Sequence, residues 1–221
     1  MIVAEQKPID EILKSVENFD KILILGCNTC VAVCMAGGEK EVGILASLIR
    51  LAREKEGRPI EILEKTVERQ CDDEFLLAEM DLFDRVPAIL STACGVGVQQ
   101  LSALLSIPVL PALNTKFMGG TKDHCIWSER CAGCGDCILE LTGGICPITR
   151  CAKGLLNGPC GGSSNGKCEV NPDTDCAWQL IIDRMTSLGQ LDKLMEIQPP
   201  KNWQAARDGG PRTVTREDVK L

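Results

Sequence analysis

Tyrosine is absent from the sequence, and aromatic residues make up only 3% of it. A buried core must therefore consist mostly of leucine, isoleucine, valine and alanine. Histidine occurs once, as His124, and we expect it to be a partly exposed bystander rather than a metal ligand beside Cys125. The sequence offers no convincing acid–base pair either. We therefore expect no catalytic residues and no substrate chemistry of the chain's own.

Long apolar runs are also lacking, so nothing in the pattern predicts a membrane span. The first residues lead into Glu5, Gln6 and Lys7 rather than into the apolar region of a signal peptide. Basic residues are outnumbered, with 24 Lys and Arg against 31 Asp and Glu and a net charge of −7. An acidic chain repels phosphate backbones, which argues against a nucleic-acid partner. We expect a soluble, cytoplasmic protein without membrane insertion.

Cysteine, in contrast, is abundant, with fourteen residues in 221. A reducing cytoplasm argues against the alternative of a secreted disulfide framework. The thiols are therefore interpreted as metal ligands. Two kinds of site compete: structural zinc, and iron–sulfur clusters that carry electrons.

The first half of the sequence alternates short apolar segments with amphipathic ones. Strands are expected at residues 21–25, 60–63, 86–90 and 108–110, and helices at 8–18, 39–56, 72–83 and 95–105. This alternation predicts an α/β fold with a parallel, Rossmann- or flavodoxin-like sheet.

The pattern changes after Pro111, because residues 119–176 are rich in glycine and cysteine and show little periodicity. Such a segment cannot build a large hydrophobic core and needs bound metal to stabilise its fold. We predict an α/β domain with one metal cluster at residues 1–117 and a small Cys-rich, ferredoxin-like iron–sulfur domain at 118–180. Residues 181–221 are expected to form a C-terminal helix and an extended tail, a candidate partner-binding arm.

Five cysteines follow the predicted strands. Cys27, Cys30 and Cys34 form C-x2-C-x3-C after the first strand, Cys71 lies beyond the second, and Cys94 follows the third. Ligands of open parallel sheets bind beyond the carboxyl ends of the strands, so the fold would gather these thiols. Four thiolates satisfy one [4Fe–4S] cluster or one zinc ion; we favour Cys27, Cys30, Cys34 and Cys94, with Cys71 as the alternative ligand. A thioredoxin-like redox pair at Cys27 and Cys30 would leave Cys34 and Cys94 without a role.

Nine further cysteines lie in residues 125–176. A tight C-x2-C-x2-C triplet is formed by Cys131, Cys134 and Cys137. With Cys146 before Pro147, it partly matches the signature of two-cluster ferredoxins, although the gap before Cys146 is longer. The other candidate ligands are Cys125, Cys151, Cys160, Cys168 and Cys176. The chain is thus expected to hold two to three [4Fe–4S] clusters, with zinc as the alternative at one site.

Several longer segments resemble a known family across nearly the whole chain. They are CNTCVAVCMAGGEKEV at 27–42, ACGVGVQQL at 93–101, PALNT at 111–115, CAGCGDC at 131–137, GGICPITRCAKGLLNGPCGGSSNGKCE at 143–169 and CAW at 176–178. Together they resemble the small, MetV-type subunit of the methylenetetrahydrofolate reductase of acetogenic bacteria. The C-terminal region of that family is described as zinc-containing.

The resemblance implies a partnership. In such enzymes a separate, flavin-containing TIM-barrel subunit reduces methylenetetrahydrofolate to methyltetrahydrofolate in the Wood–Ljungdahl pathway. This chain would be the electron-transfer subunit, relaying electrons through [4Fe–4S] clusters to that flavin, with ferredoxin or another redox subunit as the donor. The flavin would belong to the partner only. The alternative is a structural zinc-binding adaptor that links the reductase to other redox subunits.

Overall fold

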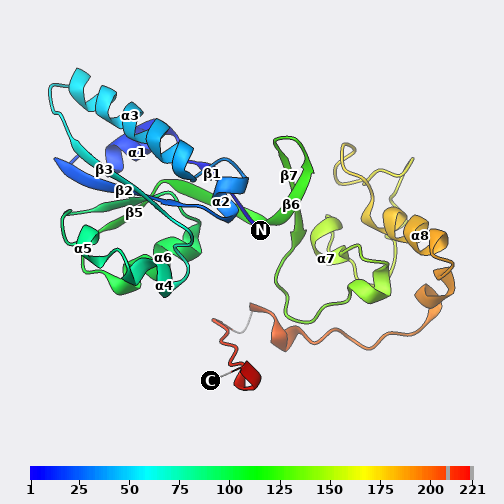
Figure 1. Ribbon diagram of the computed structural model, residues 1–221. Coiled ribbons are helices and arrows are strands. Elements are labelled where there is room, and N and C mark those ends of the chain that lie inside the picture. The colour runs from blue at the N-terminus through cyan, green and yellow to red at the C-terminus, as the bar shows by residue number, and fades with distance from the viewer. Residues whose placement is uncertain (208–209, 220–221) are drawn as a thin grey trace. The chain divides into compact units, whose positions relative to one another are not determined.

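The computed structural model describes residues 1–207 and 210–219, and its chain divides into two compact units (Figure 1). Unit 1 comprises Met1–Ser128 and unit 2 comprises Glu129–Leu221. In the described part of the chain, none of the helices has the length and apolar character needed to cross a membrane.

Unit 1 contains a parallel sheet of four strands. These are β2 (Lys21–Cys27), β3 (Glu61–Val67), β4 (Ile89–Ser91) and β5 (Val109–Pro111). The strands are ordered β3-β2-β4-β5, and all three pairings are parallel. The prediction of an α/β fold with a parallel sheet is therefore confirmed.

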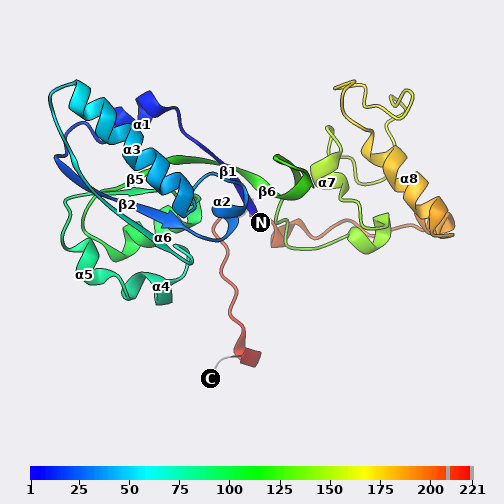
Figure 2. The same ribbon diagram turned by 45° about the horizontal axis from the view of Figure 1, so that its top comes forward.

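Helices cover both faces of this sheet (Figure 2). One face packs on α1 (Ile9–Ser15) and α3 (Glu39–Lys55), and the other on α4 (Asp73–Leu77), α5 (Met80–Phe83) and α6 (Gly95–Leu104). Successive residues of a strand point to opposite faces, so Ile22 and Ile24 join the first core while Leu23 and Leu25 join the second. All four side chains are fully buried, which explains why this strand is continuously apolar rather than alternating.

A second sheet of three strands was not expected from the sequence. It has the order β1-β6-β7, formed by β1 (Ile2–Gln6), β6 (Leu113–Asp123) and β7 (Ile126–Cys131). β1 pairs antiparallel with β6, so the start of the chain lies beside residues more than a hundred positions away. Because β6 runs across residue 117, where we placed a domain boundary, Cys125 lies in unit 1 and not with the later cysteines.

Two helices differ in extent from the prediction. The helix expected at 72–83 is divided into α4 and α5. The C-terminal helix, expected within residues 181–221, is α8 (Ala177–Ser187), which begins earlier and stops before Gly189. Gly189 adopts a left-handed conformation with φ of 66°, the usual way in which glycine ends a helix.

Unit 2 is made mainly of short helices and loops in its described part. Besides α8, unit 2 contains the short α-helix α7 (Pro147–Arg150). It also contains the 3-10 turns η1 (Leu139–Thr142), η2 (Leu191–Met195), η3 (Trp203–Ala205) and η5 (Glu217–Val219). Its buried core is small and centres on Trp178, Ile181 and Met185. A core of this size gives limited stability, in keeping with a domain that needs metal to fold. The ferredoxin-like architecture itself stays a prediction.

One buried charge stabilises unit 1 by joining the ends of two helices. Arg53, in the last turn of α3, is only 2% exposed. Its guanidinium donates hydrogen bonds to the carbonyl oxygens of Glu17 at 2.8 Å and Arg58 at 2.9 Å, and more weakly to those of Phe19 and Val16. Removing the guanidinium would leave these four carbonyl oxygens without this donor.

We therefore expect Arg53→Ala to lower the free energy of unfolding of unit 1 by about 3 kcal/mol, since several hydrogen bonds of a buried charged group are lost. Urea denaturation followed by circular dichroism would measure the change. Lys55→Ala, at an exposed position of the same helix end, serves as the control and should change the value by less than about 0.5 kcal/mol. Equal effects of the two substitutions would contradict the structural role given to Arg53.

Candidate metal centres

Four cysteines come together at the carboxyl edge of the parallel sheet. Cys27 ends β2, Cys30 is the first residue of α2 (Cys30–Val33), Cys71 lies in the loop after β3, and Cys94 immediately precedes α6. Since β2 lies between β3 and β4, the three loops that carry these residues are neighbours. Between β2 and β4 the strand order reverses, which is the place where open α/β sheets bind ligands.

The thiols at this edge influence one another electrostatically. Burial raises the pKa of Cys71, and nearby Cys27, Cys94 and Cys30 raise it further. The raised pKa means that several thiolates cannot accumulate here without repulsion. A bound cation removes that repulsion, and thiolate ligands are deprotonated when metal binds. The chemistry of the donors therefore fits a thiophilic metal or cluster.

Helix α6 adds a favourable field at the same edge. Cys94 is its N-cap residue, and the helix continues for ten residues. The partial positive charge at a helix N-terminus stabilises anions and favours the thiolate form of cysteine. Gly95, the first residue of the helix, is fixed by a hydrogen bond from its amide to the Thr115 hydroxyl at 2.8 Å.

Cys34 has different surroundings, although it belongs to the same C-x2-C-x3-C motif. Its buried thiol donates to the carbonyl oxygens of Ala4 at 3.5 Å and Val31 at 3.6 Å. Burial is the main cause that raises the pKa of Cys34. The Cys34 sulfur therefore lies among the backbone of β1 and α2, whereas Cys71 lies in the exposed loop after β3. The fourth ligand of this site stays a prediction.

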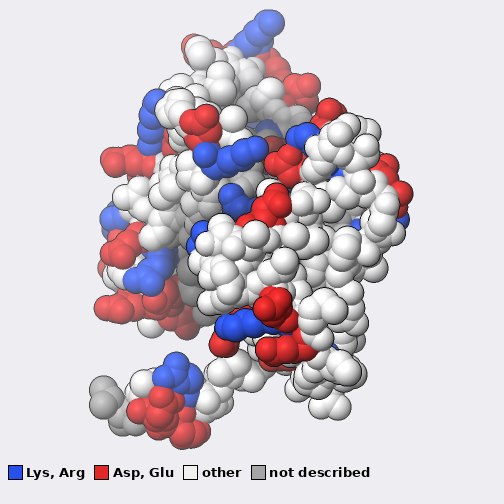
Figure 3. Space-filling model, turned by 90° about the vertical axis from the view of Figure 1, so that its right-hand side faces the viewer, with Lys and Arg blue, Asp and Glu red and all other residues white. Residues whose placement is uncertain are grey.

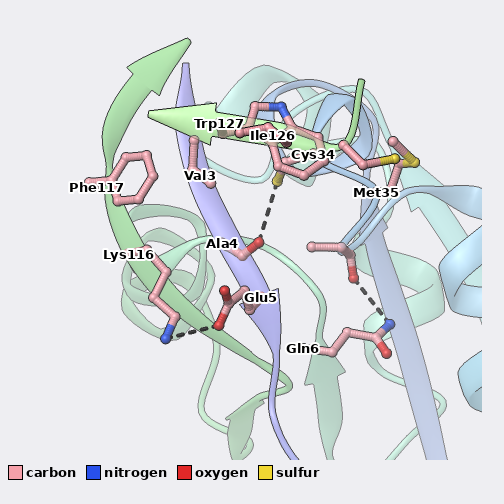
Figure 4. Close-up of a pocket in the computed structure, with 12 residues that line it drawn as sticks. Val3, Ala4, Glu5, Gln6, Cys34, Met35, Lys116, Phe117, Ile126 and Trp127 are labelled. Carbon is pink, nitrogen blue, oxygen red and sulfur yellow. Dashed lines mark hydrogen bonds and ion pairs between the residues drawn. The ribbon is translucent and has the colours of Figure 1, made fainter. Parts of the chain in front are cut away.

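Cys34 instead lines a cavity of about 480 Å³ beside β1, together with Cys125 (Figure 4). The close-up shows the Cys34 sulfur directed at the Ala4 carbonyl. Trp127 also lines the cavity, and within the described residues its buried indole N–H has no hydrogen-bond partner. The rim carries an ion pair between Lys116 and Glu5 at 2.9 Å.

In unit 2, the cysteine triplet occupies a loop shaped by glycine. The amide of Gly133 donates to the sulfur of Cys131 at 3.3 Å. Gly133 and Gly135 both have positive φ, of 61° and 82°, which a residue with a side chain adopts at a cost. Amide-to-sulfur bonds of this kind stabilise thiolates and metal-bound sulfur.

The C-terminal tail packs on this same loop. The Lys201 side chain is 3% exposed; its ammonium lies 3.6 Å from the Asp136 carboxylate and donates to the Asp136 carbonyl. Arg212 donates to the carbonyl oxygens of Gly133 at 2.8 Å and Ala205 at 2.7 Å. A Cβ on Gly135 would collide with the Ala205 carbonyl. The tail thus contacts its own unit and brings two cations to the triplet loop.

A second set of thiols surrounds a tight turn. Asn165 and Gly166, both with positive φ, join Ser164 to Lys167. The backbone of Cys168 is bonded to Thr174, and that of Cys176 to Gly166, so the chain folds back beside the turn. The amide of Gly162 donates to the sulfur of Cys160 at 3.4 Å.

Cys176 differs electrostatically from Cys34 and Cys71 of unit 1, because its pKa is lowered and theirs are raised. Burial raises its pKa, but hydrogen bonds from the Gln179 amide, Ser163 and the Trp178 amide outweigh that effect and lower the pKa overall. Cys176 is also the N-cap of α8, so the helix field favours its thiolate. Cys151 packs against the same small core as Cys176.

The cysteines are neighbours at these places without forming closed sites. Among residues 1–207 and 210–219, no three Cys, His, Asp or Glu side chains are arranged as a metal-binding group. Of the remaining predicted ligands, Cys134 and Cys137 lie in the triplet loop, and Cys146 precedes α7. His124 is exposed in the turn between β6 and β7.

Residues 110–204 match the family model described as "Methylene-tetrahydrofolate reductase C terminal". The matched segment begins in β5 and includes every cysteine from Cys125 to Cys176. It links this part of the chain to methylenetetrahydrofolate reductases, as the sequence motifs suggested. No curated protein and no solved structure matches the chain.

The pKa of Cys176 is lowered and that of Cys71 is raised, which predicts that the two thiols are alkylated at different rates. In metal-free, reduced protein at neutral pH, Cys176 should be alkylated faster than Cys71, because the thiolate is the nucleophile and a lowered pKa increases its fraction. Mass spectrometry after brief treatment with iodoacetamide would measure both sites. Cys71 is the more exposed of the two thiols, so faster alkylation of Cys71 would show that access and not pKa decides.

Proposed function

We propose that the chain is an electron-transfer subunit of a methylenetetrahydrofolate reductase. The observation that carries the proposal is the gathering of Cys27, Cys30, Cys71 and Cys94 at one sheet edge, in a chain whose later cysteines lie in a matched reductase segment. The lack of an acid–base pair in the sequence supports a carrier rather than a catalyst.

In this proposal Cys27, Cys30, Cys71 and Cys94 would hold one [4Fe–4S] cluster. Such a cluster supplies a one-electron carrier whose potential depends on burial, nearby charge and hydrogen bonds to sulfur. The protein's own residues contribute the α6 N-terminus beside Cys94 and the hydroxyl of Thr29, 3.6 Å from the Cys27 sulfur. Cys34 would stay protonated in its cavity.

The cysteines of unit 2 would hold one or two further clusters, with zinc at one site as the alternative. The amides of Gly133 and Gly162 already donate to cysteine sulfurs, and Lys201 and Arg212 place positive charge on the triplet loop. Both features favour an anionic cluster or a thiolate-bound metal in this unit.

The partners in this proposal come from the resemblance of the sequence motifs to the small reductase subunit. A separate, flavin-containing catalytic subunit would reduce methylenetetrahydrofolate, and ferredoxin or another redox subunit would supply electrons. Such a reductase would act in one-carbon metabolism, in a pathway of the Wood–Ljungdahl type.

The face of the molecule shown in Figure 3 carries basic and acidic side chains side by side, so its charge pattern is not that of a phosphate-binding surface.

Metal analysis separates this function from the zinc adaptor. We expect the anaerobically purified chain to be brown, with broad absorption near ~400 nm and about eight to twelve iron atoms, four for each cluster. Dithionite should bleach the colour and produce an EPR signal. A colourless protein that contains only zinc would identify the chain as an adaptor, because Zn²⁺ has no redox chemistry.

The proposed ligand set of unit 1 predicts that substitution of Cys71 and substitution of Cys34 have different effects on the iron content. Cys71→Ser should remove about four iron atoms and the EPR signal of one cluster, since a cubane cluster needs four protein thiolates. Cys34→Ser should retain them, because its thiol bonds to backbone carbonyls. Coupled reduction of the partner's flavin should fall only in Cys71→Ser. The reverse pattern would assign the fourth position to Cys34.

A further inference from the structure

A buried hydrogen-bond network joins the segments of unit 1 that carry Cys27, Cys71 and Cys94. Gln70 and Ser91 are both 0% exposed. The side-chain amide of Gln70 donates to the Leu25 carbonyl at 2.7 Å, and its oxygen accepts a hydrogen bond from the Ser91 hydroxyl at 2.6 Å. The Ser91 oxygen accepts in turn from the Ala93 amide at 3.2 Å.

Each member of this network stands close in sequence to a candidate ligand. Gln70 immediately precedes Cys71, Leu25 lies two residues before Cys27, and Ser91 lies three residues before Cys94. A single side chain therefore ties the loop after β3 to the ends of β2 and β4. These are the three segments that must keep a fixed separation if their thiols are to share one metal group.

The surroundings of Gln70 leave it little freedom to move. A Cβ added at Gly97, in the first turn of α6, would lie 2.8 Å from the Gln70 Cβ, so helix and loop are in close contact. A second hydrogen bond connects the end of β4 to the segment before α3: the Thr92 hydroxyl donates to the Gly37 carbonyl at 2.8 Å. The backbone of Cys27 also donates to the Gly37 carbonyl at 3.0 Å.

A buried amide is a costly choice for filling space, because an apolar side chain of similar volume needs no partners. The amide of Gln70 instead makes hydrogen bonds that depend on orientation. Its acceptor, the Leu25 carbonyl, belongs to β2, and its donor, the Ser91 hydroxyl, belongs to β4. Groups that orient metal ligands in this way change metal affinity strongly when they are removed.

We infer that Gln70 and Ser91 are positioning residues that hold the loops of Cys27, Cys71 and Cys94 in register around one metal group. The inference rests on the proposed cluster of unit 1. It concerns neither the clusters of unit 2 nor the electron partners.

The test compares Gln70→Met and Ser91→Ala with Gln100→Met in the anaerobic, cluster-loaded full chain. Methionine keeps the length of glutamine but lacks the amide donor and the carbonyl acceptor. Gln100, which bonds to Asp73 at 2.7 Å between α6 and α4, provides the matched control outside the network. The readouts are the rate at which an iron chelator removes each cluster and the midpoint potential of the unit 1 cluster, identified as the EPR signal missing in Cys71→Ser.

We expect Gln70→Met and Ser91→Ala to lose the unit 1 cluster about tenfold faster than the unaltered chain, with a displaced potential. The clusters of unit 2 and the Gln100→Met variant should keep their rates. Because both single changes break one shared bond, the double variant should be no faster than the faster single variant. If Gln70→Met does not fold, Ser91→Ala decides the test.

Unchanged rates and potential in both variants would overturn the inference while leaving the cluster in place. Equal acceleration in both units would also overturn it, because it would reveal general destabilisation. An unaltered chain without iron at Cys27, Cys30, Cys71 and Cys94 would contradict the proposed cluster itself, and the inference with it.

Discussion

The position of β2 between β3 and β4 is the constraint on which the rest of unit 1 depends. Cys27, Cys71 and Cys94 are separated by 44 and 23 positions in the sequence, and only parallel pairing of these strands brings the loops that follow them together. The apolar cores on the two faces keep the strands in place, and the Gln70 network links their ends. The sheet, rather than a local sequence motif, therefore determines how these thiols are arranged.

The parallel sheet was predictable because its signals are local. A continuous apolar strand at residues 21–25, a helix after Gly38 and a cysteine just before α6 are visible without long-range information. The second sheet was not predictable. β6 is mostly exposed and contains Gly119 and Gly120, and its partner β1 lies far away in the chain. Propensity for such strands depends on their neighbours, so the place of Cys125 could not be found from its spacing.

The candidate site was predictable in its residue types and its edge, but not in its details. Ser91 follows a predicted strand directly, and Gln70 lies in the predicted loop between residues 63 and 72. Loop residues are usually polar, and only the fold buries these two. The different surroundings of Cys34 and Cys71 likewise depend on tertiary contacts, because Ala4 reaches Cys34 from the unpredicted β1. In unit 2, the contact of Lys201 with Asp136 gives the tail an intramolecular role that its charged, proline-containing sequence did not indicate.

Exposure of Cys71 has a consequence for the conditions under which the protein can work. Electron tunnelling weakens steeply with distance, so a carrier whose ligand reaches the surface can exchange electrons quickly with a docked partner. In the proposed cluster the same exposure would give dioxygen a short path to sulfur and iron, and accessible thiolates are the ones that oxidise first. For the proposed carrier, fast electron exchange and oxygen tolerance would thus be opposed at this edge, and a partner's surface that covers Cys71 would protect the cluster only while the complex is assembled.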